Sequence, residues 1–288
     1  MTSLSRITAI AGNTLLELVR QKVFYFMLLF ATVAIGAAFA ASAIPFAEVF
    51  QVLKDASLGA MTIFSWLLVT LATAMILPKD LEDRTLYTIL AKPVSRLEYL
   101  LGKLLGVLLL LAVALALMSV LFSIALLIRE RIAIAGALRD YGTGPDGQAA
   151  IAEIKRAAFD WNLVPAILVI FTKSAVCAAL TLLLSTFASS WIFTVMISVS
   201  VYVIGHLQPL VREAWLTQGD VNPSELLKVL MGFVSLVFPD FQLFNIVDEI
   251  VVGNAVPGWM FGQTFALGFG YVFVYTLVGY IAFSNREI

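Results

Sequence analysis

The sequence predicts an all-α integral membrane protein, and three observations lead to this fold class. The chain is 61% hydrophobic with only 13% charged residues, and the apolar residues gather in uninterrupted runs instead of the spaced stripes of soluble helices. Several runs reach the roughly 20 residues that carry a helix across about 30 Å of hydrocarbon. Continuous Leu, Ala, Val and Phe favour helices, because barrel strands alternate apolar and polar residues. We expect six transmembrane helices in a single domain, 1–288.

The N-terminal stretch, 3–22, predicts an amphipathic elbow helix that lies in the membrane surface. Its polar face gathers four side chains, Arg6, Asn13, Glu17 and Arg20. The first span is expected directly after it, at 23–44, and begins with three aromatic residues, which favour the membrane interface.

Two further spans enclose the most charged short stretch of the chain. The second span is expected at 58–77, ending at Pro78. The third is expected at 100–128, which is longer than a bilayer requires, so one end should protrude. Ser95 and Glu98 form an S-x-x-E capping box in front of it.

The second half of the chain predicts three more spans. A polar outer loop, 129–162, leads to spans at 163–187 and 191–206, which three residues separate into a tight hairpin. The last span is expected at 259–283. Before it, the outer segment 207–258 contains an apolar part too short to cross, so we expect this segment to re-enter the membrane or to lie at its interface.

Lys and Arg near the span ends set the expected orientation. Nine of the 18 fall on the side of the N-terminus and eight on the other, in longer loops, which favours a multi-pass protein of the cell membrane with both termini cytoplasmic. The formal net charge of −1 gives no reason to expect nucleic acid as a partner.

Few residues suggest chemistry. The chain has no G-x-x-x-x-G-K-[ST] phosphate loop and a single His, so neither catalysis nor a metal site nor a cofactor of its own is expected. Lys173, in the fourth span, is either part of a substrate pathway or satisfied by polar groups of neighbouring helices. Asp240, Asn245 and Asp248 in the outer segment are candidates for ligand contacts or helix caps.

An inner helix is expected at 80–91, between the second and third spans. Acids at its front and Lys92-Pro93 at its end suit a short helix. A charged helix with an apolar side docks into a groove on a cytoplasmic partner, or else it is a solvated connector. The residues expected to make such a contact are Glu82, Asp83, Arg84, Leu86, Ile89 and Leu90.

Several motifs of this region form a recognisable series. They are Glu82, Arg84-Thr-Leu86, Leu90-Ala-Lys-Pro-Val-Ser-Arg96 and Leu100-Leu-Gly-Lys103, joined later by Phe238-Pro-Asp-Phe-Gln-Leu-Phe-Asn-Ile-Val-Asp248. With this series the chain resembles the permease subunits of ABC-2 type transporters. The resemblance implies a half-transporter that couples through the inner helix to an ATP-binding-cassette ATPase. It also implies a dimer with a second permease copy or a homologous permease, surrounded by lipid, with ATP and Mg bound by the partner ATPase.

Three functions follow from these expectations. The first is an ATP-driven exporter that moves a substrate across or out of the membrane. The second is a mechanical transmission subunit, in which the same ATPase cycle acts on an extracytoplasmic protein and no solute crosses. A secondary transporter would predict inverted repeats and several ionisable groups at the midplane, where the sequence offers only Lys173.

Overall fold

The computed structural model describes residues 3–41, 49–82, 94–159, 161–188, 190–217, 238–246, 250 and 256–285. Within them every regular element is a helix, as the fold class predicts. In chain order these are α1 (Ser3–Arg20), α2 (Lys22–Ala41), α3 (Val49–Glu82), α5 (Arg96–Tyr141), α6 (Pro145–Ala158), α7 (Leu163–Phe187), α8 (Trp191–Thr217), the 3-10 helix η1 (Phe241–Phe244) and α11 (Gly258–Ser284).

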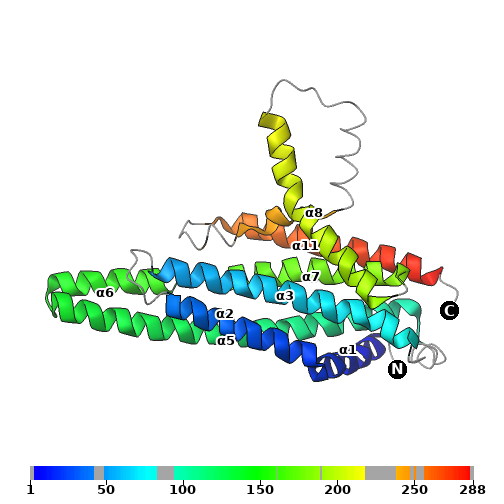
Figure 1. Cartoon of the computed structure of the whole chain (residues 1–288), viewed down its shortest axis with the longest axis horizontal. Coiled ribbons are helices and arrows are strands. Elements are labelled where there is room, and N and C mark those ends of the chain that lie inside the picture. Colours follow the sequence, from blue (N-terminus) through cyan, green and yellow to red (C-terminus); the bar gives the residue numbers. More distant parts are fainter. Residues whose placement is uncertain are drawn as a thin grey trace.

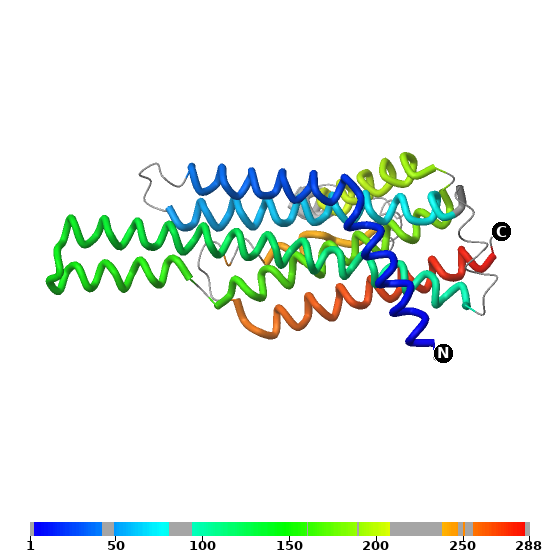
Figure 2. Tube along the Cα trace, turned by 90° about the horizontal axis from the view of Figure 1, so that it is seen from below, coloured from blue at the N-terminus to red at the C-terminus, as the bar shows by residue number. Residues whose placement is uncertain are grey.

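Helices α2, α3, α5, α7 and α11 run side by side as a bundle, and α8 turns away from it (Figures 1 and 2). Helix α7 lies at its centre, packed against α11, α3, α5 and α8, and most of its residues are buried. Helix α1 crosses the bundle obliquely at the end where both termini lie (Figure 2). Helices α2 and α11 lie at the periphery and expose many large apolar side chains, which suits contact with lipid.

Length and composition identify the membrane spans. Five stretches are long and apolar enough to cross, and they are Lys22–Ala41, Val49–Asp80, Arg96–Tyr141, Pro145–Phe187 and Gly258–Ser284. A sixth span was expected at 191–206, but the apolar helical part there, Trp191–Leu207, is shorter than the other five. The described residues therefore form a multi-pass membrane protein with five to six apolar helices.

Helix α3 passes the residue at which the second span was expected to end. It begins at Val49 and runs through Pro78 to Glu82. Proline removes one helical hydrogen bond and usually ends or kinks a helix, but here the following turn is held in place because Asp80 is buried and paired with Lys103. The last turn of α3 thus occupies the expected start of the inner helix, whose remainder lies outside the described residues.

Helix α5 is much longer than the expected span 100–128. Its 46 residues extend about 69 Å at 1.5 Å per residue, more than twice the hydrocarbon thickness. It ends at Gly142, which adopts a φ of 66°. Helix α6 then returns beside it, and the two extend past the other helices (Figure 1). The stretch 129–162, expected as a loop, is therefore mostly a helical hairpin.

Two glycines let α1 lie directly on α5. A Cβ built on Gly102 would lie 2.6 Å from Cγ2 of Ile10, and one built on Gly106 would lie 2.6 Å from Cβ of Thr14 and 2.9 Å from the carbonyl oxygen of Ala11. Small residues four apart allow this closeness between membrane helices. Helix α1 thereby packs directly on the first turns of α5.

We predict that Gly106→Ala lowers the thermal unfolding midpoint of the purified chain in detergent, because α1 must move away from α5. Overpacking of this kind costs about 1–3 kcal/mol. Gly136→Ala is the matched control on the same helix, where an added Cβ meets nothing within 4 Å. The control should be neutral or slightly stabilising, since alanine is the better helix former. Equal midpoints for the two variants would contradict the close crossing.

Candidate functional site

The expected coupling residues belong to the segment that leaves α3 and returns at α5. The side chains of Glu82, Asp83, Arg84, Leu86, Ile89 and Leu90 lie outside the described residues, so their role stays a prediction. The described residues do include the helix ends from which this segment emerges, the last turns of α3 and the first turns of α5. These roots form the first part of the candidate site.

A buried ion pair joins the two roots. Lys103 Nζ on α5 lies 2.7 Å from Asp80 Oδ2 on α3, and the two side chains are only 5% and 10% exposed. The Tyr99 hydroxyl donates a short hydrogen bond to the same carboxylate oxygen. Taking charges out of water is costly, and attraction offsets that cost only with close geometry and additional hydrogen bonds. Both conditions hold here, so the pair fixes where α3 meets α5.

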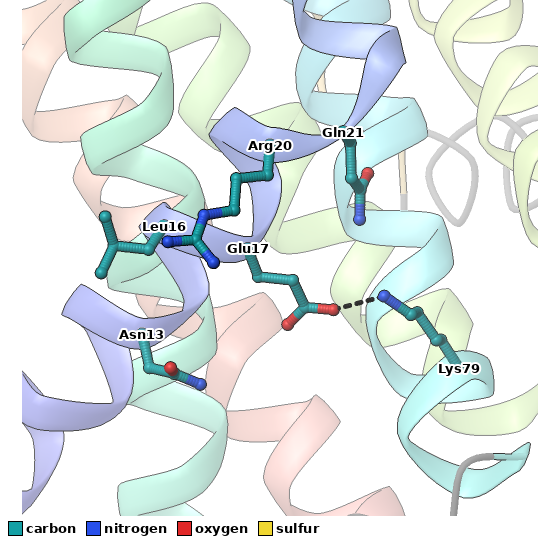
Figure 3. A pocket seen from close by; sticks show the side chains of 6 residues that line it. All are labelled: Asn13, Leu16, Glu17, Arg20, Gln21 and Lys79. Atoms are coloured by element: carbon teal, nitrogen blue, oxygen red, sulfur yellow. Dashed lines mark hydrogen bonds and ion pairs between the residues drawn. The ribbon is translucent and has the colours of Figure 1, made fainter.

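Glu17 of α1 extends this pair to a third helix. Its Oε1 lies 2.6 Å from Lys79 Nζ (Figure 3). Its Oε2 lies 3.9 Å from Lys103 Nζ. The pair with Lys79 is partly exposed, so it contributes only about 0–1 kcal/mol by itself. We call this set the inner cluster, and its members are Glu17, Lys79, Asp80, Tyr99 and Lys103.

The start of α5 has the capping box that the sequence predicts. The Glu98 amide donates to Ser95 Oγ at 3.2 Å, and the Ser95 amide donates to Glu98 Oε2 at 2.8 Å. Glu98 also pairs with Arg6 of α1, at 3.5 Å. The cap therefore fixes the helix start and adds a second contact between α1 and α5.

Arg96 connects α5 to the end of α11. Its guanidinium donates to the carbonyl oxygens of Phe283, at 2.9 Å, and Ser284, at 2.7 Å. A cation at a helix C-terminus satisfies carbonyl groups without intrahelical partners and opposes the negative end of the helix dipole. The Phe283 ring in turn stacks on Tyr99 of the inner cluster, with centroids 5.9 Å apart. Four helices thus meet around the roots of the segment between α3 and α5.

The second part of the candidate site surrounds Lys173, which is buried in α7. Its Nζ lies 3.0 Å from Nε2 of His206 on α8 and faces the rings of Tyr202, at 5.9 Å, and Phe241, at 6.0 Å. His206 Nδ1 lies 3.0 Å from the Tyr202 carbonyl oxygen, so that nitrogen carries the proton and Nε2 accepts from the ammonium. An imidazole and two aromatic faces accordingly surround the lysine, as cation–π geometry favours.

A pocket of about 200 Å³ opens beside Lys173. Its polar lining includes Asp55, Asn245, Tyr202 and His206. Of the expected outer candidates, Asn245 therefore lines this pocket. Asp240 does not line it; its Oδ1 caps η1 by accepting from the Gln242 amide at 3.0 Å. The third candidate, Asp248, falls outside the described residues.

The two parts of the site lie at different depths of the bundle. Asp55 and Asp80 stand on the same helix, 25 residues apart, which corresponds to about 38 Å. The inner cluster therefore belongs to the end that carries both termini, and the lysine pocket lies toward the other end. Both parts consist of polar contacts between helices, a geometry that suits positioning and binding.

Sequence reasoning did not find the inner cluster or the partner of Lys173. The only available signals were opposite charges just inside two consecutive spans, Asp80 and Lys103, and one His near a span end. Charges and a histidine at these positions do not indicate which helices are in contact.

Comparison with known proteins gives one family. The family model described as ABC-2 family transporter protein matches residues 8–288, nearly the whole chain. No curated protein matches the sequence.

Proposed function

The chain belongs to the ABC-2 family of transporter proteins, and on that basis we propose that it is the permease subunit of an ATP-driven exporter. The family match over 8–288 carries this proposal. Because the sequence lacks a phosphate-binding loop, a separate ATP-binding-cassette subunit binds ATP and Mg and supplies the energy. The working unit is a dimer with a second permease copy or a homologous permease, and both termini are cytoplasmic.

Coupling starts at the inner segment between α3 and α5. The apolar side chains of Leu86, Ile89 and Leu90 fill a groove on the ATPase, while Glu82, Asp83 and Arg84 set the register at its rim. The geometry of the inner cluster supports this role. Asp80 on α3 and Lys103 on α5 are in contact at the two ends of this segment. A displacement of the segment therefore moves α3 and α5 together.

The substrate pathway includes the pocket beside Lys173. A buried ammonium in a membrane helix is expensive, and this one stands at the edge of a polar pocket between α3, α7 and α8. A polar part of a substrate needs hydrogen-bond partners while it passes the apolar interior of the bundle. Lys173 and Asn245 provide hydrogen-bond donors at this pocket.

A second candidate function is mechanical transmission to an extracytoplasmic protein. The observation that favours it is the hairpin of α5 and α6, which extends past the other helices (Figures 1 and 2). A helix continuous from the inner cluster to that tip transmits motion without a solute pathway. Export remains the preferred function because the hairpin is small and a polar pocket lies inside the bundle.

We predict that Leu86→Ala combined with Ile89→Ala leaves the permease inserted and dimeric but weakens copurification of its ATPase or removes substrate-dependent ATP hydrolysis. The physical reason is that buried apolar anchors contribute most to binding, while rim charges contribute little. The matched control is Leu127→Ala with Ile128→Ala, which truncates two exposed apolar residues of α5. A full complex with normal stimulation would show that coupling enters elsewhere.

We further predict that Lys173→Leu changes transport or coupled ATP hydrolysis in proteoliposomes while membrane insertion is unaffected. The variant removes the cation and its hydrogen bond to His206 but keeps an apolar stem. Lys155→Leu, at an exposed position of α6, is the control. If Lys173→Leu transports and hydrolyses ATP like the unchanged chain, the lysine has only a structural role and the pathway lies elsewhere.

A further inference from the structure

A second polar pocket lies beside the inner cluster, at the junction of α1 with the first span. Its volume is about 590 Å³, and its lining residues are Asn13, Leu16, Glu17, Arg20, Gln21 and Lys79 (Figure 3). Five of these come from α1 and the residue that follows it, and Lys79 reaches toward them from α3. The pocket is therefore built by two elements that the inner cluster holds together.

The pocket carries more hydrogen-bond donors than the protein uses. Glu17 is occupied by Lys79 and Lys103. Among the described residues, by contrast, no ion pair or hydrogen bond involves the guanidinium of Arg20 or the side-chain amides of Asn13 and Gln21. A guanidinium offers five N–H donors in a planar fork, a shape that matches phosphate oxygens.

The position of the pocket points to a lipid as the source of the anion. Gln21 separates α1, an amphipathic helix expected at the membrane surface, from α2, which begins at Lys22 and is long and apolar enough to cross a membrane. From Lys22 onward, one face of α2 exposes residues at helical spacing, and they are Tyr25, Phe26, Leu29, Phe30 and Val33. An acyl chain that lies along this face would place its headgroup beside Arg20.

We propose that this pocket binds the phosphate of an anionic phospholipid, with Arg20 as the main ligand and Asn13 and Gln21 as additional donors. Basic pockets at the cytoplasmic ends of membrane helices suit anionic headgroups, and charge-assisted bonds to phosphate are the strong class. Lys79 borders the pocket while it pairs with Glu17. A bound phosphate shares this lysine, so the lipid adjusts how tightly α1 is held to α3. The proposal needs no ATPase and no particular transport direction.

The test is native mass spectrometry of the purified full-length chain in mixed micelles. The micelles contain equal amounts of phosphatidylglycerol and phosphatidylcholine with identical acyl chains. We expect the unchanged chain to retain phosphatidylglycerol preferentially. Arg20→Gln should lower that preference about fivefold, the value expected for one cationic side chain near a lipid surface. Arg20→Lys keeps the charge and should retain most of the preference.

Arg139→Gln is the matched control, because it removes an exposed arginine from the far end of α5. Equal loss of phosphatidylglycerol in Arg20→Gln and Arg139→Gln would overturn the proposal, since the effect would then be one of net charge. Displacement of the bound lipid by an excess of inorganic phosphate would overturn it as well, in favour of a free anion. So would unchanged lipid retention in Arg20→Gln together with loss of the ATPase from the copurified complex, in favour of a protein partner.

Discussion

The inner end of the bundle is organised by the neutralisation of one buried ammonium, that of Lys103. A lysine this far from water is stable only beside a carboxylate that is itself hydrogen-bonded, and Asp80 with the Tyr99 hydroxyl meets that requirement. This explains why α3 continues through Pro78, because ending the helix there would take Asp80 away from its partner. It also explains why the carboxylate of Glu17, on α1, lies near the same ammonium.

The consequence of this arrangement is mechanical. The segment between α3 and α5 is rooted on both sides in side chains that also contact α1 and α11, through Glu17 on one side and Arg96 on the other. The close crossing at Gly102 and Gly106 adds a contact without flexible side chains between α1 and α5. A protein that pushes on the segment therefore moves four helix ends together. Under the proposed function, work done by the partner ATPase would enter the membrane domain here.

The features that the sequence predicted correctly depend on residues close together in the chain. The all-helical membrane fold follows from hydropathy, α7 has the predicted bounds 163–187, and the capping box at Ser95 is formed as its spacing predicts. The prediction was wrong at Pro78, where a tertiary contact overrides a local signal and α3 continues to Glu82. Helix α5 also extends beyond the expected span, to Tyr141. The sequence also could not predict which side chains of different helices touch, such as Lys173 and His206. Hydropathy identifies each helix but does not say how one helix is aligned with another.

We conclude that the Asp80–Lys103 pair fixes the ends of α3 and α5 from which the segment between them emerges. A double-mutant cycle on the free energy of unfolding tests this claim most directly. The variants are Asp80→Leu, Lys103→Met and the two combined, measured on the purified chain in mixed micelles. Each single variant should lose about 3–5 kcal/mol, because it leaves a buried charge without its partner, and the combination should recover most of that loss. Losses that simply add would contradict the claim, because they would mean that the two side chains do not depend on each other.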